Sequence, residues 1–215
     1  MSRDLEQPIA ERVREAAAQA TPLAIVGGGS KEWYGRTPVG ERLDLAGHAG
    51  ILSYEPSELV IRARAGTLLA EIVAALAENG QHLPFDPPAF GASATLGGSI
   101  ACGLSGPSRP YAGSARDHVL GARIVNGQGE VLEFGGQVMK NVAGYDVSRL
   151  MAGALGSLGV LLDVSLKVLP RPACELTLAK ECTAANAIAA MNAWAGRPLP
   201  ISAAAFDGIR LVMRL

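Results

Sequence analysis

The sequence predicts an α+β fold with a long first domain and a short second one. Segments of helical periodicity and short apolar strands follow one another along the 215-residue chain. The 26 glycines gather between apolar segments, where tight turns or close backbone approaches are expected. The clusters lie at 27–29, 97–98, 103–106 and 153–159. The strongest break is Leu169-Pro170-Arg171-Pro172, which predicts a first domain at 1–172 and a second at 173–215.

The composition excludes several classes of protein. Hydrophobic residues make up 49% of the chain and charged residues 18%, which is typical of a folded globule. The net charge of −1 gives no broad attraction to nucleic acid or to an anionic membrane. The N-terminus is polar, and the longest apolar stretch, Leu150 to Leu162, is too short for a membrane span. We therefore expect a cytoplasmic protein without a signal peptide or direct membrane insertion. Its three cysteines, without a paired framework, should be reduced thiols.

The first half of the chain predicts two helices and two strands. A helix is expected at 8–20, and a short strand follows at 23–26. Residues 58–65 alternate between apolar and charged side chains, which predicts a half-buried strand. A second helix is expected from Thr67, as its N-cap, to Gly80. The apolar stripe of this helix comprises Leu68, Leu69, Ile72, Val73 and Leu76.

The second half begins with a segment of weak periodicity. Residues 84–111 are rich in Gly, Pro and Ser, and we expect an ordered functional loop. Strands at 119–126 and 130–134 should form a hairpin around a Gly-Gln-Gly turn. A short helix is expected at 146–154 and a strand at 160–168.

The last 40 or so residues predict a strand, a helix and a second strand. The strand is expected at 176–181, the helix at 184–195 with Thr183 as its cap, and a strand-like tail at 204–215. Such a tail would leave a sheet edge unpaired. We therefore expect that the second domain is truncated or that a partner completes it.

Several familiar motifs are missing. The segment after Val26 has no third glycine in G-x-G-x-x-G register and does not fit the P-loop pattern. A G-x-S-x-G nucleophile motif is also missing. His48, His82 and His118 have no ligand partners at metal-binding spacing, so we predict no metal site. None of these residues can be assigned as a catalytic base from the sequence, although His82 and His118 are weak candidates.

Two glycine-rich segments suggest a binding site for an anion. Three consecutive glycines at 27–29 could turn their N–H groups towards an anion, with Ser30 and Lys31 adding a hydroxyl and a charge. Residues 94–107 offer many potential donors and small side chains, as a diphosphate and a flat ring would require. The alternative for both segments is a structural loop that needs glycine only for its backbone conformation.

Five motifs in order resemble a known family. They are GGGSK, ATLGGSIACGLSGPSRP, YAGSARDHVLGARIVNGQGEVLEFGG, KNVAGYDVSRLMAGALGSLGVL and KVLPRP. Together they resemble the FAD domain of the vanillyl-alcohol-oxidase/p-cresol-methylhydroxylase (PCMH) family. VMKNVAGYDVSRLMAG and IACGLSGPSRP are similar to the FAD-binding subunits of bacterial glycolate oxidases. The resemblance covers roughly residues 20–175 and continues weakly beyond.

The resemblance implies a PCMH-type domain of two subdomains that hold an extended FAD, followed by the start of an incomplete cap domain. The FAD should be noncovalent, because no histidine lies beside the glycine loops. The pyrophosphate would be wrapped by Gly27, Gly28, Gly29, Ser30 and Lys31. The pyrophosphate, ribityl and flavin region would be lined by Thr95, Leu96, Gly97, Gly98, Ser99, Gly103, Ser105 and Gly106. The flavin and ribityl chain would lie beside Gly113, Ser114 and Asp117, and the adenosine side beside Gly156, Gly159 and Val160.

A further segment of the resemblance has no role assigned by chemistry. Lys140, Tyr145 and Asp146 match a recurrent family sequence, and a structural contact between the lysine and the aspartate is the alternative.

The resemblance also implies a function. The chain would be the FAD-binding subunit of a complex that oxidises glycolate or another small 2-hydroxy acid, with the flavin accepting a hydride. Electrons would pass to a second flavoprotein subunit and an iron–sulfur subunit, which could hold the chain peripherally at the inner membrane. One alternative is a noncatalytic flavin-binding or electron-relay subunit. Another is a different FAD-linked 2-hydroxy-acid dehydrogenase.

Overall fold

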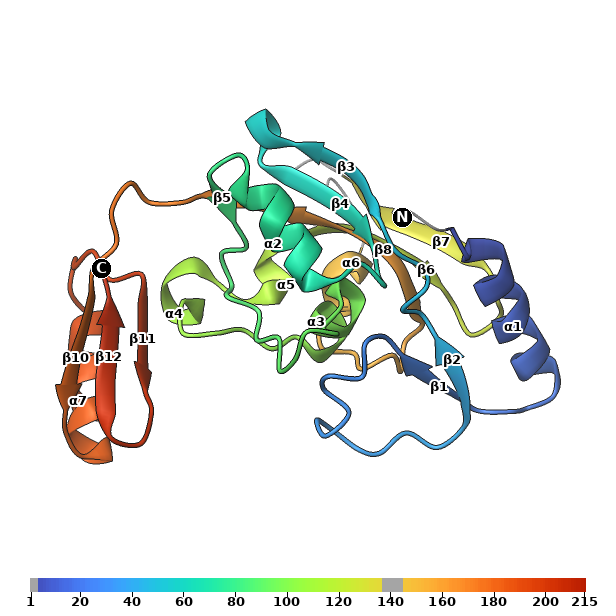
Figure 1. The fold of residues 1–215 in the computed structure, drawn as a ribbon. Helices are drawn as coiled ribbons and strands as arrows, with labels where there is room; N and C mark the ends of the chain where they lie inside the picture. Colours follow the sequence, from blue (N-terminus) through green and yellow to red (C-terminus); the bar gives the residue numbers. More distant parts are fainter. Residues whose placement is uncertain (1–3, 137–144) are drawn as a thin grey trace.

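The computed structural model describes residues 4–136 and 145–215 and shows a mixed α/β architecture (Figure 1). At its centre lies a five-stranded sheet in the order β3-β4-β8-β6-β7, with every neighbouring pair antiparallel. The strands are β3 (Ile51–Glu55), β4 (Val60–Arg64), β8 (Val160–Lys167), β6 (Val119–Val125) and β7 (Val131–Gly135). The predicted strands at 58–65 and 160–168 and the predicted hairpin are confirmed.

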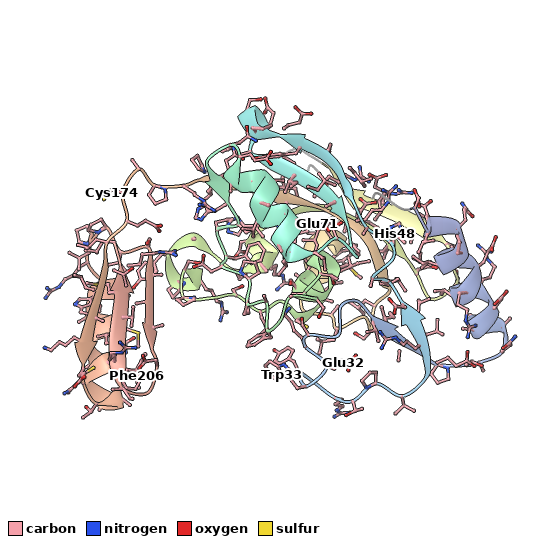
Figure 2. The ribbon with its side chains drawn as sticks, viewed as in Figure 1. Glu32, Trp33, His48, Glu71, Cys174 and Phe206 are labelled. Carbon is pink, nitrogen blue, oxygen red and sulfur yellow. The ribbon has the colours of Figure 1, made fainter. Side chains whose placement is uncertain are left out.

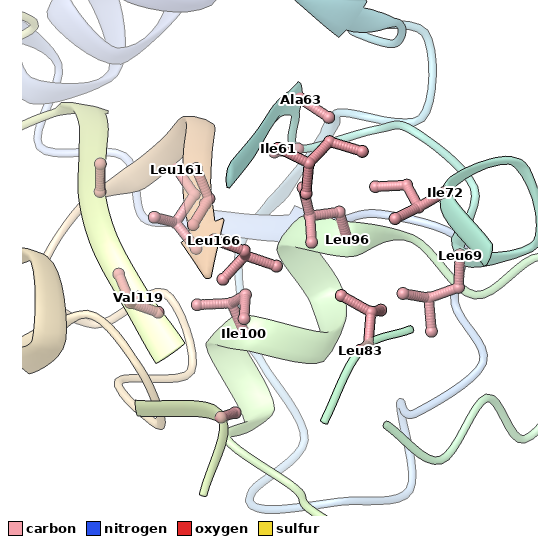
Figure 3. Packing of buried hydrophobic residues seen from close by; sticks show 14 of the residues in the cluster. Ile61, Ala63, Leu69, Ile72, Leu83, Leu96, Ile100, Val119, Leu161 and Leu166 are labelled. Atoms are coloured by element: carbon pink, nitrogen blue, oxygen red, sulfur yellow. The ribbon is translucent and has the colours of Figure 1, made fainter. Parts of the chain in front are cut away.

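One face of this sheet packs against two helices. They are α2 (Leu69–Ala77) and α3 (Leu96–Cys102), and they form the larger hydrophobic core with strands β4, β6 and β8 (Figure 3). Burial of these aliphatic side chains contributes about 25 cal/mol per Å² of apolar surface removed from water. The core therefore fixes α3, and with it the cavity described below, against the sheet. Its most buried aliphatic members include Ile61, Ile72, Leu96, Ile100 and Leu166.

A second core forms around the first helix of the chain. Helix α1 (Glu6–Ala18) packs with β1 (Leu23–Val26), β2 (Glu41–Asp44) and side chains of β6 and β8. Strands β1 and β2 are parallel, with Val26 opposite Asp44. The opening helix and the strand at 23–26 are thus confirmed. Their packing holds the end of β1, from which the glycine loop at 27–29 leaves.

Three predictions for residues 67–111 are wrong. Thr67 does not cap α2, because its hydroxyl accepts from the Gly50 N–H at 2.9 Å and donates to the Gly50 carbonyl at 3.2 Å. Val73 lies outside the apolar stripe and is 44% exposed. Residues 84–111 are not one loop, since they contain α3 and α4 (Arg109–Ala112). Thr95 caps α3 by accepting from the Gly98 N–H at 3.2 Å. Helix α3 consists mostly of small residues, which gives it little hydrophobic periodicity.

The remaining elements of the main body are short. Strands β5 and β9 pair antiparallel, with His82 opposite Leu169. The short elements are the 3-10 helix Pro56–Glu58, β5 (Gln81–His82), β9 (Leu169–Pro170), α5 (Ala115–His118) and α6 (Val147–Leu150). The helix predicted at 146–154 is therefore reduced to one turn.

The last part of the chain forms a small sheet in the order β10-β12-β11, which carries helix α7 (Figure 1). The elements are β10 (Thr177–Glu181), α7 (Ala184–Ala195), β11 (Ala203–Phe206) and β12 (Arg210–Arg214). Thr183 caps α7 as predicted, by accepting from the Asn186 N–H. The tail is not one strand, because it turns at Asp207 and Gly208 into a hairpin that places β12 at the centre.

Two polar contacts join the small sheet to the main body. Arg214 pairs with Asp86 at 3.3 Å, and the Ala204 N–H donates to the Pro107 carbonyl at 3.3 Å. Among the described residues, no helix combines the length and the apolar character that a membrane crossing requires.

We predict opposite tolerances at two adjacent glycines of α3. A Cβ at position 97 would lie 2.6 Å from the Ala65 Cβ, whereas one at position 98 would meet only the Thr95 hydroxyl, at 3.1 Å. Gly97→Ala should lower the free energy of unfolding by about 1–3 kcal/mol through overpacking. Gly98→Ala should change it by less than about 1 kcal/mol, since alanine favours the helix. Urea unfolding of both variants measures this, and equal losses would contradict the packing described here.

Candidate functional site

A cavity of about 390 Å³, called cavity A here, opens where the loop after β1, helix α3 and the turn before β8 meet. Its volume falls within the roughly 300–1,000 Å³ range of small-molecule pockets. Of the residues predicted to bind the cofactor, ten line it. They are Gly27, Gly28, Gly29, Ser30, Lys31, Thr95, Gly97, Gly98, Gly156 and Gly159. Three segments far apart in the sequence are therefore brought to one cavity.

The glycine loop after β1 is pressed against residues 93–95. A Cβ at Gly28 would lie 1.4 Å from the Ser93 carbonyl oxygen, and one at Gly27 would lie 2.5 Å from the Thr95 hydroxyl. Only glycine permits this approach. The backbone N–H groups of residues 27–31 make no hydrogen bond to any other residue that the structure describes. They are therefore available to an acceptor in cavity A, as expected for an anion-binding turn.

Lys31 brings a buried positive charge to the same cavity. The residue is 8% exposed, and its Nζ lies 3.3 Å from the Ala89 carbonyl oxygen, 3.4 Å from Ser30 Oγ and 3.5 Å from Ser99 Oγ. Within the described ranges no carboxylate lies at ion-pair distance from it. Burial lowers the pKa of Lys31. A buried cation without a counter-ion is unfavourable, and an anionic ligand would compensate it.

Helix α3 forms part of the wall of cavity A, but its first N–H groups are already hydrogen-bonded within the protein. The N–H groups of Leu96 and Gly97 donate to the carbonyls of Thr67 and Ala65, each at 2.8 Å, and that of Gly98 donates to Thr95. The expectation of many free donors in this segment is therefore wrong for its first three residues. The Leu96 side chain lies in the core, and the bare backbone at Gly98 leaves space open.

The turn before β8 reaches cavity A through two glycines in the left-handed region. Gly156 has a φ of +77°, and a Cβ there would lie 3.1 Å from Ile25 Cδ1. Gly159 has a φ of +149°, and a Cβ there would lie 2.8 Å from the Val125 carbonyl oxygen. These positions need glycine for backbone conformation and close packing. The next residue, Val160, is buried in the second core and does not line the cavity.

Besides Leu96, Ser99 and Val160, six further predicted cofactor contacts lie outside the lining of cavity A. Ser105 Oγ accepts from the Ala115 N–H at 2.9 Å, and the Asp117 carboxylate accepts from the Ser114 N–H and hydroxyl at 2.8 Å. These bonds from Ser114 lower the pKa of Asp117. The polar atoms thus hold the turn at 103–118 together, and contact with FAD there stays a prediction. The six residues are Gly103, Ser105, Gly106, Gly113, Ser114 and Asp117.

Sequence reasoning missed several residues of cavity A. Tyr34, Arg36, Cys102 and Leu155 all line it. Burial raises the pKa of the Cys102 thiol, which keeps it protonated at neutral pH. Tyr34 and Arg36 follow closely after the glycine loop in the sequence, and this could have indicated that they reach the same site. The available signal for Leu155 was its place beside Gly156.

Trp33 and Phe90 form an aromatic pair, and each lies close in sequence to one partner of the contact between Lys31 and Ala89. Trp33 follows the glycine loop and is 63% exposed (Figure 2). Its ring meets that of Phe90 edge to face, with centroids 5.1 Å apart. Since Lys31 also contacts the carbonyl oxygen of Ala89, two contacts join these distant segments beside cavity A.

The segment around Asp146 has a local structural role. Asp146 caps α6 by accepting from the Arg149 N–H at 3.1 Å and the Ser148 hydroxyl at 2.8 Å. Tyr145 is exposed. Lys140 lies outside the described residues, so its predicted contact with Asp146 stays a prediction.

Two of the three histidines are bound to backbone. His48 is buried, and its Nδ1 accepts from the Leu5 N–H at 3.0 Å. The Nε2 of His118 lies 2.9 Å from the Ala112 carbonyl oxygen, while its buried Nδ1 has no partner among the described residues. None of the three histidines lines cavity A. No catalytic base could be assigned from the sequence, and no histidine is found among the described residues that line cavity A.

Comparison with curated proteins places this site in context. The chain is 51% identical over 212 residues to glycolate oxidase subunit GlcE of Escherichia coli (strain K12), a match covering 99% of this chain and 61% of that protein. It is 32% identical over 128 residues to glycolate oxidase subunit GlcD of Bacillus subtilis (strain 168), covering 60% and 27% of the two chains. D-lactate dehydrogenase of Anaerostipes hadrus is also 32% identical over 128 residues, covering 60% and 26%. The chain thus spans about three-fifths of the length of the first of these relatives.

The sequence family described as "FAD binding domain" matches residues 5–135. That range contains the glycine loop, Lys31 and helix α3, together with most of the residues that line cavity A. The chain therefore belongs to the FAD binding domain family.

Proposed function

We propose that this chain holds FAD noncovalently in cavity A as the FAD-binding subunit of a glycolate or other 2-hydroxy-acid oxidase. The observation that carries the proposal is the buried, uncompensated Lys31 beside the free N–H groups of the glycine loop. Membership of the FAD binding domain family and the 51% identity to a glycolate oxidase subunit support the choice of cofactor and complex.

The residues of cavity A fit a dinucleotide diphosphate. A pyrophosphate carries negative charge and many acceptor oxygens, which match a lysine ammonium and a row of backbone N–H groups. Ser30 and Ser99 place hydroxyls beside the same ammonium. We assign the adenosine side to the turn at Gly156 and Gly159, where bare backbone reaches the cavity. Val160 supports that turn from the core.

The chain's own residues bind and orient, while a bound flavin supplies the two-electron acceptor chemistry. We assign the turn at 103–118 to the flavin and ribityl side. Its internal hydrogen bonds from Ser114 to Asp117 and from Ala115 to Ser105 would pre-organise it. Passage of electrons to a second flavoprotein subunit and an iron–sulfur subunit belongs to the same proposal. So does a cytoplasmic place for the complex, peripheral to the inner membrane.

The domain assignment is part of the proposal. Residues 1–172 would form a PCMH-type FAD domain of two subdomains, and 173–215 the start of a cap domain. The separate small sheet β10-β12-β11 and the two cores on opposite sides of the five-stranded sheet support this division.

A noncatalytic flavin-binding or relay subunit is the second candidate. It is favoured by the lack of a histidine in the lining of cavity A. Adding glycolate to the purified, flavin-loaded chain without oxygen separates the two. Loss of the oxidised-flavin absorbance would support oxidation by this subunit, and an unchanged spectrum would support the noncatalytic role.

The Lys31→Met substitution should weaken FAD binding but stabilise the flavin-free protein. Loss of the ammonium should weaken FAD binding by roughly ten- to hundredfold, as for a hydrogen bond to a charged group of about 1.5–3 kcal/mol. The flavin-free variant should unfold about 2–4 °C higher, because a desolvated charge worth on the order of 1 kcal/mol is removed. Fluorescence titration and thermal melts measure both effects. Wild-type FAD affinity in this variant would contradict the assignment of Lys31.

FAD affinity should depend on the charge of Lys31. Burial lowers its pKa, so its ammonium loses its proton at a lower pH than an ordinary lysine. An anion-binding contribution that needs the charged form is present below that pKa and lost as the pH rises through it. The wild-type dissociation constant should therefore increase between neutral pH and pH ~10, near the ordinary lysine pKa. Lys31→Met serves as the control and should show a flatter profile over the same range.

Gly98→Val should block cavity A while leaving the fold intact. The position faces open space apart from the Thr95 hydroxyl, so branched methyl groups would occupy the place of a ligand. We expect purified Gly98→Val to carry less than about a tenth of the wild-type flavin, a loss of over 1.4 kcal/mol in binding. Its circular dichroism should match that of Gly98→Ala. Normal flavin stoichiometry would refute the placement of FAD in this cavity.

A further inference from the structure

A second cavity of about 560 Å³, called cavity B here, is lined by the loop at 83–94, whose Ala89 carbonyl also contacts Lys31. Helix α2, the linker at 171–175 and Arg214 of β12 complete its walls. The residues that line it differ from those that line cavity A. Cavity B is therefore a separate site, formed jointly by the main body and the small C-terminal sheet.

The β5–β9 ribbon directs two polar side chains to cavity B. His82 pairs with Leu169, and the Arg171 N–H donates to the Gly80 carbonyl at 2.7 Å, so Gly80 lies opposite Arg171. Residues two apart on an antiparallel ribbon share a face, and diagonal neighbours lie roughly 7–8 Å apart. His82 and Arg171 thus share the face on which Gly80 has no side chain. Both line cavity B.

The opposite face of the ribbon is anchored to the main body. Gln81 is buried, accepts from the Tyr54 hydroxyl at 2.8 Å and donates to the Pro56 carbonyl at 2.8 Å. These two hydrogen bonds fix which way the ribbon faces. The direction of His82 and Arg171 towards cavity B is therefore set by the fold.

Two arginines and two carboxylates line cavity B, and one of the arginines makes no ion pair with a described residue. Arg214 pairs with Asp86 and with Glu175, each at 3.3 Å, so both carboxylates of the cavity are engaged. Arg171 is exposed, and neither its guanidinium nor the His82 ring makes a hydrogen bond or ion pair with another described residue. Burial lowers the pKa of His82, which keeps the ring neutral at neutral pH. Arg171 is thus the group with charge to offer a ligand.

The rest of the lining is apolar. Leu69, Ala70 and Val73 of α2 face Leu83 and Pro87 across the cavity. This accounts for an exposed Val73 on a helix that otherwise buries its large aliphatic side chains, Leu69, Ile72 and Leu76. An apolar wall with one planar cation suits a small organic acid, since guanidinium binds carboxylate through two parallel hydrogen bonds.

We propose that cavity B binds a small organic carboxylate, with Arg171 as its counter-ion and His82 as a hydrogen-bond partner. The binding itself needs no flavin. The identity of the natural ligand rests on the proposed function, under which it would be the 2-hydroxy acid or its 2-oxo product.

Calorimetric titration of the purified chain with glycolate tests the proposal, with glycolamide as the uncharged comparison. Arg171→Leu should weaken glycolate binding at least tenfold, and Arg171→Lys should retain part of the affinity. His82→Gln should weaken it a few-fold. Arg197→Leu removes an exposed arginine outside cavity B and should bind glycolate as the wild type does. Circular dichroism should show all four variants folded.

Wild-type affinity in Arg171→Leu, or equal binding of glycolamide and glycolate, would overturn the proposal. Two variants keep this outcome separate from the fate of the proposed function. Lys31→Met should bind FAD more weakly yet bind glycolate normally, and Arg171→Leu should bind glycolate more weakly yet keep its flavin. If the wild type bound no FAD while glycolate binding still depended on Arg171, the flavin assignment would fail and cavity B would stand.

Discussion

A lysine ammonium held out of water without a carboxylate is the constraint on which cavity A depends. The packing of α1 against β1 and of α3 against the sheet brings Lys31, Ser30 and Ser99 together. Folding therefore places a positive charge where the described residues supply no negative one. The unbonded N–H groups of residues 27–31 add to the same imbalance. An anionic cofactor would remove both costs at once, which links its binding to the stability of the loop.

The glycines of this chain serve two physical purposes that look alike in sequence. Gly28, Gly97 and Gly159 are required by the protein, because a Cβ at each would collide with its own main chain or side chains. Gly98 differs, since its missing side chain leaves open space in cavity A. A glycine-rich motif therefore combines positions that maintain the fold with positions that admit a ligand. Only the three-dimensional structure distinguishes these two kinds of glycine.

Much of the fold could be predicted from local patterns. Alternation predicted the strand around Ile61, and a cap followed by an apolar stretch predicted the helix after Thr183. Helix α3 was missed because small residues show little periodicity, and Thr67 was misassigned because a tertiary contact with Gly50 outweighs its local capping tendency. The hairpin at Asp207 was missed because its turn was read as part of one strand.

The candidate site could be predicted only in part, because local sequence patterns do not show which distant segments come together. The loop at 27–31 and the turn at Gly156 could be found from glycine spacing and family resemblance, and cavity A brings them together. Cavity B could not be found in this way, because His82, Arg171 and Arg214 come from segments with no shared motif. Their proximity arises from the pairing of β5 with β9 and from the docking of the small sheet.

The ion pair between Arg214 and Asp86 has a mechanical consequence. Asp86 adopts a left-handed backbone with a φ of +45°, and Gly106 packs so closely that a Cβ there would lie 2.5 Å from the Asp86 carbonyl oxygen. Arg214 thus pairs with Asp86, whose backbone packs against the turn at 103–118. A tilt of the C-terminal sheet would therefore reach that turn both through Asp86 and through the hydrogen bond from the Ala204 N–H to the Pro107 carbonyl.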